Sequence, residues 1–190
     1  MRAIAEAPLP AARSAPLSAE EPALVRAARR GDREAFAWLH TEYAPMVHGI
    51  LLARTPRAAA EDLVQEVFLA ALEGLGGLHD DRAVGPWLAA IARHRAADFH
   101  RRRPHAAERE LPGDLAREAP PAAEAAEALE ALRALPEAYR ETLVLRLVEG
   151  MTGPEIAART GLTPGSVRVN LCRGMRLLRE RLGLGQEEDR

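Results

Sequence analysis

Apolar residues recur along this chain every three or four positions, which is the spacing of one face of an α-helix. The stretch AAAEDLVQEVFLAALEGL carries one such row on the face that we expect to be buried: Leu63, Val64, Val67, Phe68, Ala71 and Leu72. An earlier stretch carries a second row: Phe36, Leu39, Tyr43, Val47, Ile50 and Leu51. Pro45 within that row is expected to kink or split its helix. Alternating runs of Val, Ile and Thr are missing, so the pattern predicts an all-α chain.

The other face of the first of these stretches is acidic, and it includes a leucine that the helical pattern leaves exposed. These positions, called the acidic strip below, are Asp62, Gln65, Glu66 and Leu69. A helix surface that faces only water usually mixes the two signs of charge. Folding alone therefore does not account for the acidic strip.

Near the C-terminus, the sequence MTGPEIAARTGLTPGSVRVNLCRGMRLLRERLG predicts two helices joined by a short turn. Thr152 and Glu155 have the spacing of a capping box that starts the first helix. Gly161 is expected to end this helix in a turn with positive φ. Thr163 and Pro164 then provide the N-cap and the first position of a longer helix. This arrangement is typical of a DNA-binding helix-turn-helix.

The second of these helices is basic, which a plain helical hairpin would not require. Between residues 151 and 182 six arginines oppose two glutamates, which gives a net charge of +4. In the major groove, arginine can read guanine and asparagine can read adenine. The candidates for contact with duplex DNA are Thr163, Ser166, Arg168, Val169, Asn170 and Arg173. Cys172, which lies among them, is expected to be a small buried residue.

A second basic stretch, GPWLAAIARHRAADFHRRR, lies in the first half of the chain. Between residues 82 and 103 six arginines oppose one acid, Asp98, which gives a net charge of +5. Cations interleaved with aromatic residues suit single-stranded DNA, because arginines follow its backbone and its bases stack on flat side chains. The candidates for such contacts are Trp87, Arg93, His94, His100, Arg101 and Arg102. Packing in the core is an equal alternative for Trp87.

Composition divides the chain into two small helical domains joined by a flexible linker, the second domain being the helix-turn-helix. The linker region is rich in proline, and residues 104–130 have a net charge of −5, from two arginines and seven acids. The expected order is a flexible tail at residues 1–20, a helical domain at 21–103 and an acidic linker at 104–124. The helix-turn-helix domain follows at 125–183, and a C-terminal tail at 184–190. Alternatively, the acids of the linker bind to one of the two basic stretches and hold the protein in a closed state that cannot bind DNA.

Composition also excludes several classes of function. The single cysteine excludes an internal disulfide, and no spacing of cysteine or histidine indicates a metal site. No nucleophile with a matching base and no phosphate-binding glycine loop is apparent, so we expect neither enzymatic activity nor a cofactor. No stretch approaches the roughly 20 apolar residues of a membrane-spanning helix, and no signal peptide is apparent. The sequence therefore predicts a soluble, cytoplasmic protein.

Three stretches, in this order, resemble the sigma-70 family of bacterial RNA polymerase initiation factors, in its compact extracytoplasmic-function (ECF) subgroup. AEDLVQEVFLAAL resembles the second conserved region, WLAAIARHRAADFHRRR the promoter-melting helix, and LRALPEAYRETLVLRLVEGMTGPEIAARTGLTPGSVRVNLCRGMRLLRERL the fourth region. The resemblance implies that the acidic strip docks on an arginine-rich coiled coil of the largest polymerase subunit. It also implies that the first basic helix contacts the melted minus ten element and the second reads the minus thirty-five element as duplex.

The sequence therefore predicts a promoter-specificity factor that binds core RNA polymerase and promoter DNA and directs transcription initiation. The alternatives are a stand-alone helix-turn-helix regulator, and an adaptor that binds polymerase without reading promoters. The sequence leaves open whether an anti-sigma factor is a further partner. It also leaves open the promoter sequence and the inducing signal. The loop at residues 74–86 has Val84 and Gly85 where the family often has Phe-Arg, so the base that it accepts also stays open.

Overall fold

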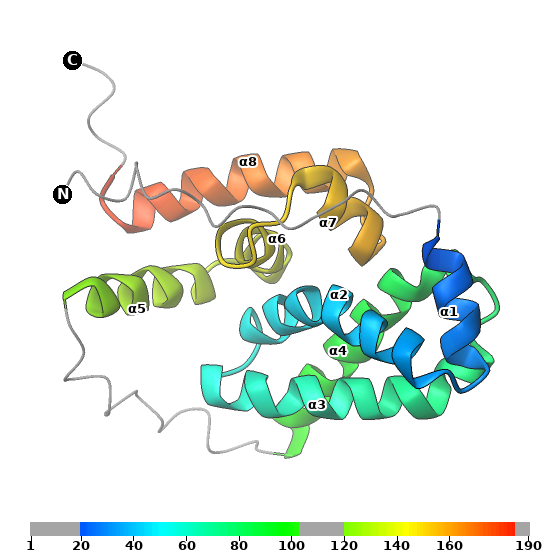
Figure 1. Ribbon diagram of the computed structural model, residues 1–190. Coiled ribbons are helices and arrows are strands. Elements are labelled where there is room, and N and C mark those ends of the chain that lie inside the picture. Colours follow the sequence, from blue (N-terminus) through cyan, green and yellow to red (C-terminus); the bar gives the residue numbers. More distant parts are fainter. Residues whose placement is uncertain (1–19, 103–119, 185–190) are drawn as a thin grey trace.

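The structure is a computed structural model that describes residues 20–102 and 120–184, with side chains from residue 127 onward in the second range. These two ranges, called the first and second blocks, contain eight α-helices and two short 3-10 helices and no strand (Figure 1). The predicted all-α fold is confirmed. The helices are α1 (Glu21–Arg29), α2 (Arg33–Leu52), α3 (Arg57–Gly74), η1 (Leu75–Gly77), η2 (Asp81–Ala83), α4 (Val84–Arg102), α5 (Pro120–Arg133), α6 (Glu137–Leu147), α7 (Gly153–Thr160) and α8 (Pro164–Arg181).

In the first block, α2 is the central helix and packs against α1, α3 and α4. The Asp32 carboxylate caps its N-terminus by accepting the backbone N–H groups of Glu34 and Ala35 at 2.9 and 3.1 Å. The apolar row predicted for this helix faces the core. The helix continues through Pro45, so the expectation that Pro45 splits it is wrong. Pro45 lies on the exposed side, where water can bond the carbonyl group that the missing N–H leaves free.

Helix α3 packs its apolar row against α2 and α4. Five of the six predicted positions are buried, namely Leu63, Val64, Val67, Phe68 and Ala71. The prediction for Leu72 is wrong, because this side chain is 56% exposed. Each residue turns a helix by about 100°, so Leu72 points away from the buried face on which Ala71 lies. It is instead on the same face as Leu69, three positions earlier.

In the second block, α6 contacts all three of the other helices. Helix α5 begins at Pro120, inside the range 104–124 that was predicted as linker. The rest of the predicted linker, residues 104–119, lies outside the described residues, as do residues 1–19 and 185–190 of the tails. Across the described ranges, no helix combines the length and the hydropathy that crossing a membrane requires.

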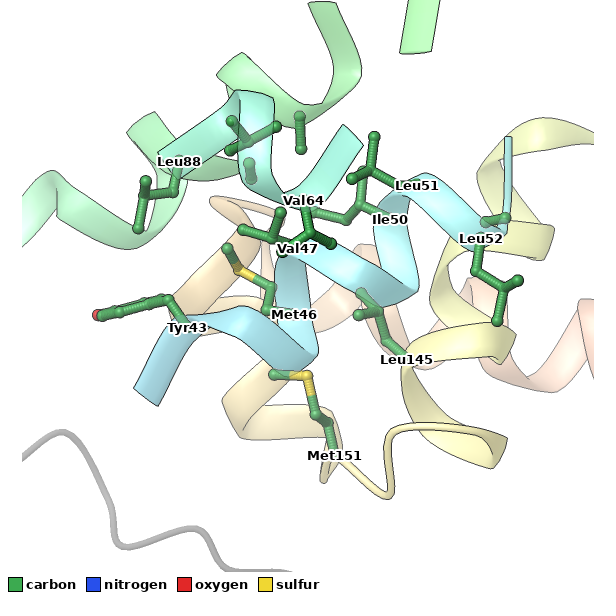
Figure 2. Close-up of a cluster of buried hydrophobic side chains, with 14 of the residues drawn as sticks. Tyr43, Met46, Val47, Ile50, Leu51, Leu52, Val64, Leu88, Leu145 and Met151 are labelled. Carbon is green, nitrogen blue, oxygen red and sulfur yellow. The ribbon is translucent and has the colours of Figure 1, made fainter. Parts of the chain in front are cut away.

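The two blocks pack directly against each other. Helix α6 contacts α2, and α7 contacts α4, so that α6 and α7 lie between α8 and the first block (Figure 1). Figure 2 shows Leu145 and Met151 of the second block in one cluster with Met46 and Ile50 of the first block, and all four are buried. The buried apolar residues of both blocks form one continuous cluster. The sequence predicted two helical units but not their shared core.

Candidate nucleic-acid and partner interfaces

The helix-turn-helix is built by the caps that the sequence predicted. The Thr152 hydroxyl accepts the backbone N–H of Glu155 at 3.4 Å, and the Glu155 carboxylate accepts the N–H of Thr152 at 2.7 Å. Gly161 ends α7 with a φ of 76°, in the region that glycine adopts readily. Thr163 then caps α8 by accepting the N–H of Ser166 at 3.1 Å. These caps are confirmed, and they fix where α8 begins.

The outer face of α8 carries most of the residues predicted to contact duplex DNA. The exposed members of that set are Thr163, Ser166, Arg168, Val169 and Arg173. Among the described residues, neither Arg168 nor Arg173 has an ion-pair partner, whereas Arg176 pairs with Glu180 at 2.8 Å. The guanidinium groups of Arg168 and Arg173 are therefore available to bases or phosphates.

Asn170 and Cys172 lie differently from the rest of this set. Asn170 is half-buried, and its amide Nδ2 donates to the hydroxyl of Thr142 on α6 at 3.3 Å. To reach a base, this amide would have to leave its partner, and its role in base reading stays a prediction. The expectation that Cys172 is buried is wrong. Cys172 lies one turn after Arg168, on the exposed face, because no helix of residues 20–102 or 120–184 covers that side of α8.

Two of the residues predicted to contact single-stranded DNA line a hollow on the first half of α4. Trp87 is half-buried, packs on the core, and lines this hollow together with Ile91 and His94. His94 is exposed, and its Nε2 lies 3.4 Å from a carboxylate oxygen of Asp98. The indole therefore combines core packing with a face toward the hollow, so both alternatives for Trp87 stay compatible with its position.

The last turn of α4 gathers three more of these residues on the surface. Arg101 and Arg102 are exposed, and Arg101 forms an ion pair with Asp98. The Nε2 atom of His100 lies 2.7 Å from the backbone carbonyl oxygen of Arg54, to which it donates. Cations at the C-terminal end of a helix are also favoured by the helix dipole. This end of α4 is thus a basic surface.

Arg93 is the exception, because the second block partly covers it and pairs with it. Its Nη2 and Nε donate to the two carboxylate oxygens of Glu141 on α6 at 2.7 and 3.2 Å. Glu141 is only 5% exposed, and it also accepts a bond of 2.5 Å from Arg54. Burial alone would raise the pKa of Glu141, but the hydrogen bonds and charges of Arg93 and Arg54 outweigh burial and lower that pKa. Glu141 is therefore ionised at neutral pH and ties two cations of the first block to α6.

The acidic strip is an open surface on α3. All four of its residues are exposed, and Leu69 is 62% exposed. Within the described part of the chain, neither Asp62 nor Glu66 has a hydrogen-bond or ion-pair partner. Leu72, which the sequence pattern assigned to the core, adds a second exposed apolar side chain to this face. The strip therefore offers unpaired acids beside a small apolar patch.

Two buried charged residues that join the two blocks were missed by sequence reasoning. Glu141 is one, and Arg159 on α7 is the other, with 6% exposure. The Nη1 of Arg159 donates to the backbone oxygen of Glu42 at 2.6 Å, and its guanidinium lies 5.2 Å from the ring centroid of Tyr43. Charged residues are seldom this buried unless they are paired. Their partners are 48 and 117 positions away in the chain, where no helical pattern can indicate them. In the described residues no cluster of His, Cys, Asp and Glu is arranged to hold a metal ion.

Comparison with known proteins matches both blocks. The family model for sigma-70 region 2 matches residues 39–105, and the family model for sigma-70 region 4 matches residues 125–178. The RNA polymerase sigma factor CarQ of Myxococcus xanthus is 38% identical over 163 residues, which cover 82% of this chain and 93% of that protein. The ECF RNA polymerase sigma factor SigD of Mycobacterium tuberculosis is 35% identical over 176 residues, which cover 84% of this chain and 82% of that protein.

A solved structure supports the same assignment. The structure of CnrH in complex with the cytosolic domain of CnrY matches with a TM-score of 0.62 and 27% identity, over 86% of this chain and 97% of that one. The chain belongs to the sigma-70 family, among the ECF RNA polymerase sigma factors. It is a promoter-recognising sigma factor that binds core RNA polymerase and promoter DNA. The region 2 match includes α3 and α4, and the region 4 match includes α6, α7 and most of α8.

Proposed function

We propose that three surfaces of this sigma factor each bind a different partner during initiation. The acidic strip on α3 docks on core RNA polymerase, α4 contacts the minus ten element as it melts, and α8 reads the minus thirty-five element as duplex. Residues 21–103 and 125–183 then act as two functional domains. The exposed charge on each helix has the sign that its partner requires, since DNA is acidic and the polymerase site implied by the family resemblance is rich in arginine.

The observation that carries the proposal is the outer face of α8. In helix-turn-helix proteins the second helix enters the major groove, and residues near its N-terminus contact the bases. Here Arg168, Val169 and Arg173 are exposed in that part of α8, and both arginines are unpaired within the described residues. A guanidinium group can donate two bonds to one guanine. Arg179 lies farther along the helix and suits phosphate contact instead.

The end of α4 supports the assignment to melted DNA. His100, Arg101 and Arg102 form an exposed basic surface that can follow a single-stranded backbone. Trp87 lies toward the other end of the same helix, in the wall of the hollow that His94 also lines. An aromatic face in a largely apolar hollow suits the flat surface of a base that has left the stack.

Two further features belong to the proposed function. We propose that this sigma factor acts by binding alone and that the catalysis of initiation belongs to the polymerase. We also propose that a protein regulator holds it, because the solved structure of its relative CnrH is a complex with the cytosolic domain of CnrY.

The experiment separates duplex reading from melting. Arg168→Ala should relax discrimination at particular base pairs of the upstream element by about 1–3 kcal/mol. Changing Arg101 and Arg102 together to Ala should weaken promoter opening on every sequence and reduce its salt dependence. The two properties are measured by binding to duplex probes with single base-pair changes, and by permanganate reactivity of unpaired thymines.

Arg30→Ala is the matched control, because Arg30 is exposed in the first block and lies on none of the three surfaces. It should change neither property. Two results would show that the roles are assigned to the wrong helices. One is an Arg168→Ala variant that discriminates between base pairs of the upstream element as wild type does. The other is a variant at Arg101 and Arg102 that opens promoters normally but discriminates differently between those base pairs.

A further inference from the structure

We propose that Asn170 sets the orientation of α8 through a hydrogen bond to Thr142 of α6, and that it does not itself read a base. Asn170 is then a positioning residue for the arginines that face DNA. This inference rests on the proposed function, in which the outer face of α8 reads the minus thirty-five element. It adds the contact that holds this face at the correct angle.

Asn170 lies at the edge of the buried face of α8. Val167, three positions earlier, and Gly174, four positions later, are both buried and lie on the same side of the helix. Arg173, three positions later on the other side, is exposed. An asparagine that reads adenine presents both ends of its amide to the base edge. The amide of Asn170 is half-buried, and its Nδ2 instead donates to Oγ1 of Thr142 at 3.3 Å.

Thr142 gives this amide a fixed partner inside the second block. The residue has an exposed fraction of 0%. Its hydroxyl donates to the backbone oxygen of Ala138 at 3.0 Å, so the hydroxyl oxygen is left to accept from Asn170. Water does not reach this oxygen to replace the amide. If Asn170 turned toward a base, a bond in the interior would be lost, and the base contact would have to offset that loss.

A second contact between α6 and α8 lies one turn farther along α8. A Cβ atom on Gly174 would lie 3.0 Å from Cδ1 of Leu143 and 3.0 Å from Cβ of Tyr139. The backbone of α8 therefore lies directly on α6 at this point. Figure 1 shows α8 lying across α6, so close contact at one crossing point leaves α8 free to swing about it. The bond between Asn170 and Thr142 lies about 6 Å along α8 from Gly174 and opposes this swing.

Packing on α7 does not fix the angle of α8 by itself. Ala157 of α7, Leu162 of the turn and Val167 of α8 are apolar, and apolar contacts have no preferred direction. These three residues line a hollow of about 650 Å³ between the two helices. The hollow leaves room for α8 to shift without a clash. A hydrogen bond is directional, so the bond to Thr142 specifies an angle that these apolar contacts leave unspecified.

A small change in this angle moves the DNA-contacting arginines farther than recognition allows. Arg168 precedes Gly174 by six positions, which is about 9 Å along the helix. A swing of about 10° about Gly174 therefore displaces the backbone at Arg168 by about 1.6 Å. Groups that recognise a ligand must be held within about 0.5 Å of their productive positions. The bond at Asn170 can therefore control base reading without contact with DNA.

The test measures the base preference of the assembled holoenzyme. Core RNA polymerase carrying the full-length wild-type protein or a variant is incubated with a pool of random-sequence duplex DNA, and the bound duplexes are sequenced. Arg168→Ala and Arg173→Ala identify the base pairs that these two arginines read. Thr142→Val removes the hydroxyl from a residue that no DNA can touch, and Asn170→Ala removes the amide.

Thr142→Val and Asn170→Ala should each lower the preference at those same base pairs by about two- to tenfold, which is the range that one hydrogen bond contributes. The double variant should lose no more than either single variant, because both changes break the same bond. Thr142→Ser keeps the hydroxyl and should retain the wild-type preference.

Thr55→Val is the matched control for the loss of a buried hydroxyl. Thr55 is 3% exposed, lies between α2 and α3, and donates its hydroxyl to the backbone oxygen of Leu51, four positions earlier, at 2.9 Å. Its replacement should lower the melting temperature much as Thr142→Val does, but it should leave base preference unchanged. A loss of preference in Thr55→Val equal to that in Thr142→Val would attribute the effect to general destabilisation and overturn the proposal.

Three other results would overturn it. One is a base pair whose preference changes in Asn170→Ala but not in Thr142→Val, since Asn170 would then read that base pair directly. Another is unchanged preference in both variants, and the third is an equal loss in Thr142→Ser and Thr142→Val.

Circular dichroism establishes that each variant folds. If Thr142→Val does not, Asn170→Leu, which keeps the size of the side chain, decides the question. Positioning predicts changes at the base pairs of Arg168 and Arg173, whereas direct reading predicts a change at a further base pair. Failure of the proposed function is a different result, in which Arg168→Ala and Arg173→Ala themselves change no base preference.

Discussion

Removing the exposed leucines of α3 should weaken polymerase binding without unfolding the protein. Leu69 and Leu72 are 62% and 56% exposed, so more than half of each residue is still available to a partner. Burying a leucine completely contributes about 1.5–3 kcal/mol. Covering the exposed part of either residue therefore contributes about 1–1.5 kcal/mol, of which alanine keeps a part. Each single Leu→Ala change should cost about 1 kcal/mol, or about fivefold in Kd, and the double change about 25-fold.

The assay is a fluorescence-anisotropy titration of the labelled sigma factor with core polymerase. Leu184→Ala is the matched control, because Leu184 is 46% exposed but lies just after α8, and it should bind like wild type. Thermal melting should be nearly unchanged in the variants at Leu69 and Leu72, since exposed positions seldom change stability by more than about 0.5 kcal/mol. Phe68→Ala, at a buried position of the same helix, should instead cost about 3–5 kcal/mol of unfolding free energy. A double leucine variant that melts normally and binds core with wild-type affinity would refute the docking assignment.

Two further predictions concern charge. Reversing both acids of the strip, Asp62→Arg with Glu66→Arg, should weaken core binding most at low salt and leave melting nearly unchanged; a wild-type Kd that does not respond to salt would contradict it. The second concerns the contact between His48 and Glu149, 2.7 Å apart, in which the hydrogen bond raises the pKa of His48 against the effect of burial. A raised pKa means that the contact stabilises the folded protein fully below about pH 6.5 and that this contribution is lost as pH rises through the raised value. The difference in unfolding free energy between wild type and His48→Gln should therefore shrink as pH rises from about 6.5 through the raised pKa, and a difference that does not change with pH would contradict the assignment.

Local chemistry explains why the helix-turn-helix could be predicted in detail. The capping box of Thr152 with Glu155, the turn at Gly161 and the cap at Thr163 each involve residues within three or four positions of one another. Such short-range bonds are readable from spacing alone. Most of the buried row on α3 was readable for the same reason. The prediction failed at Leu72, because an apolar residue beside the row looks the same in sequence whether a neighbouring helix covers it or not.

The contacts between the blocks could not be predicted in this way. Glu141 lies in α6 among ordinary helical residues, and the cations that bind it are 48 and 87 positions away. Only the folded arrangement of α2, α4 and α6 brings them together. The charge count nevertheless raised a closed state as an alternative, with the acids of the linker as the binding groups. In the structure, Glu137 and Glu141 of α6 pair with cations of the first block. The linker residues 104–119 lie outside the described ranges, so that alternative stays a prediction.

The most direct test of the central claim is transcription of fragmented genomic DNA by purified core RNA polymerase, with and without this protein, followed by sequencing of the RNA 5′ ends. A promoter-specificity factor should produce a limited set of start sites that share two upstream sequence elements at a constant spacing. Arg168→Ala should change which sites are used without abolishing initiation. If the 5′ ends have the same distribution with and without the protein, the claim that it directs promoter recognition is contradicted.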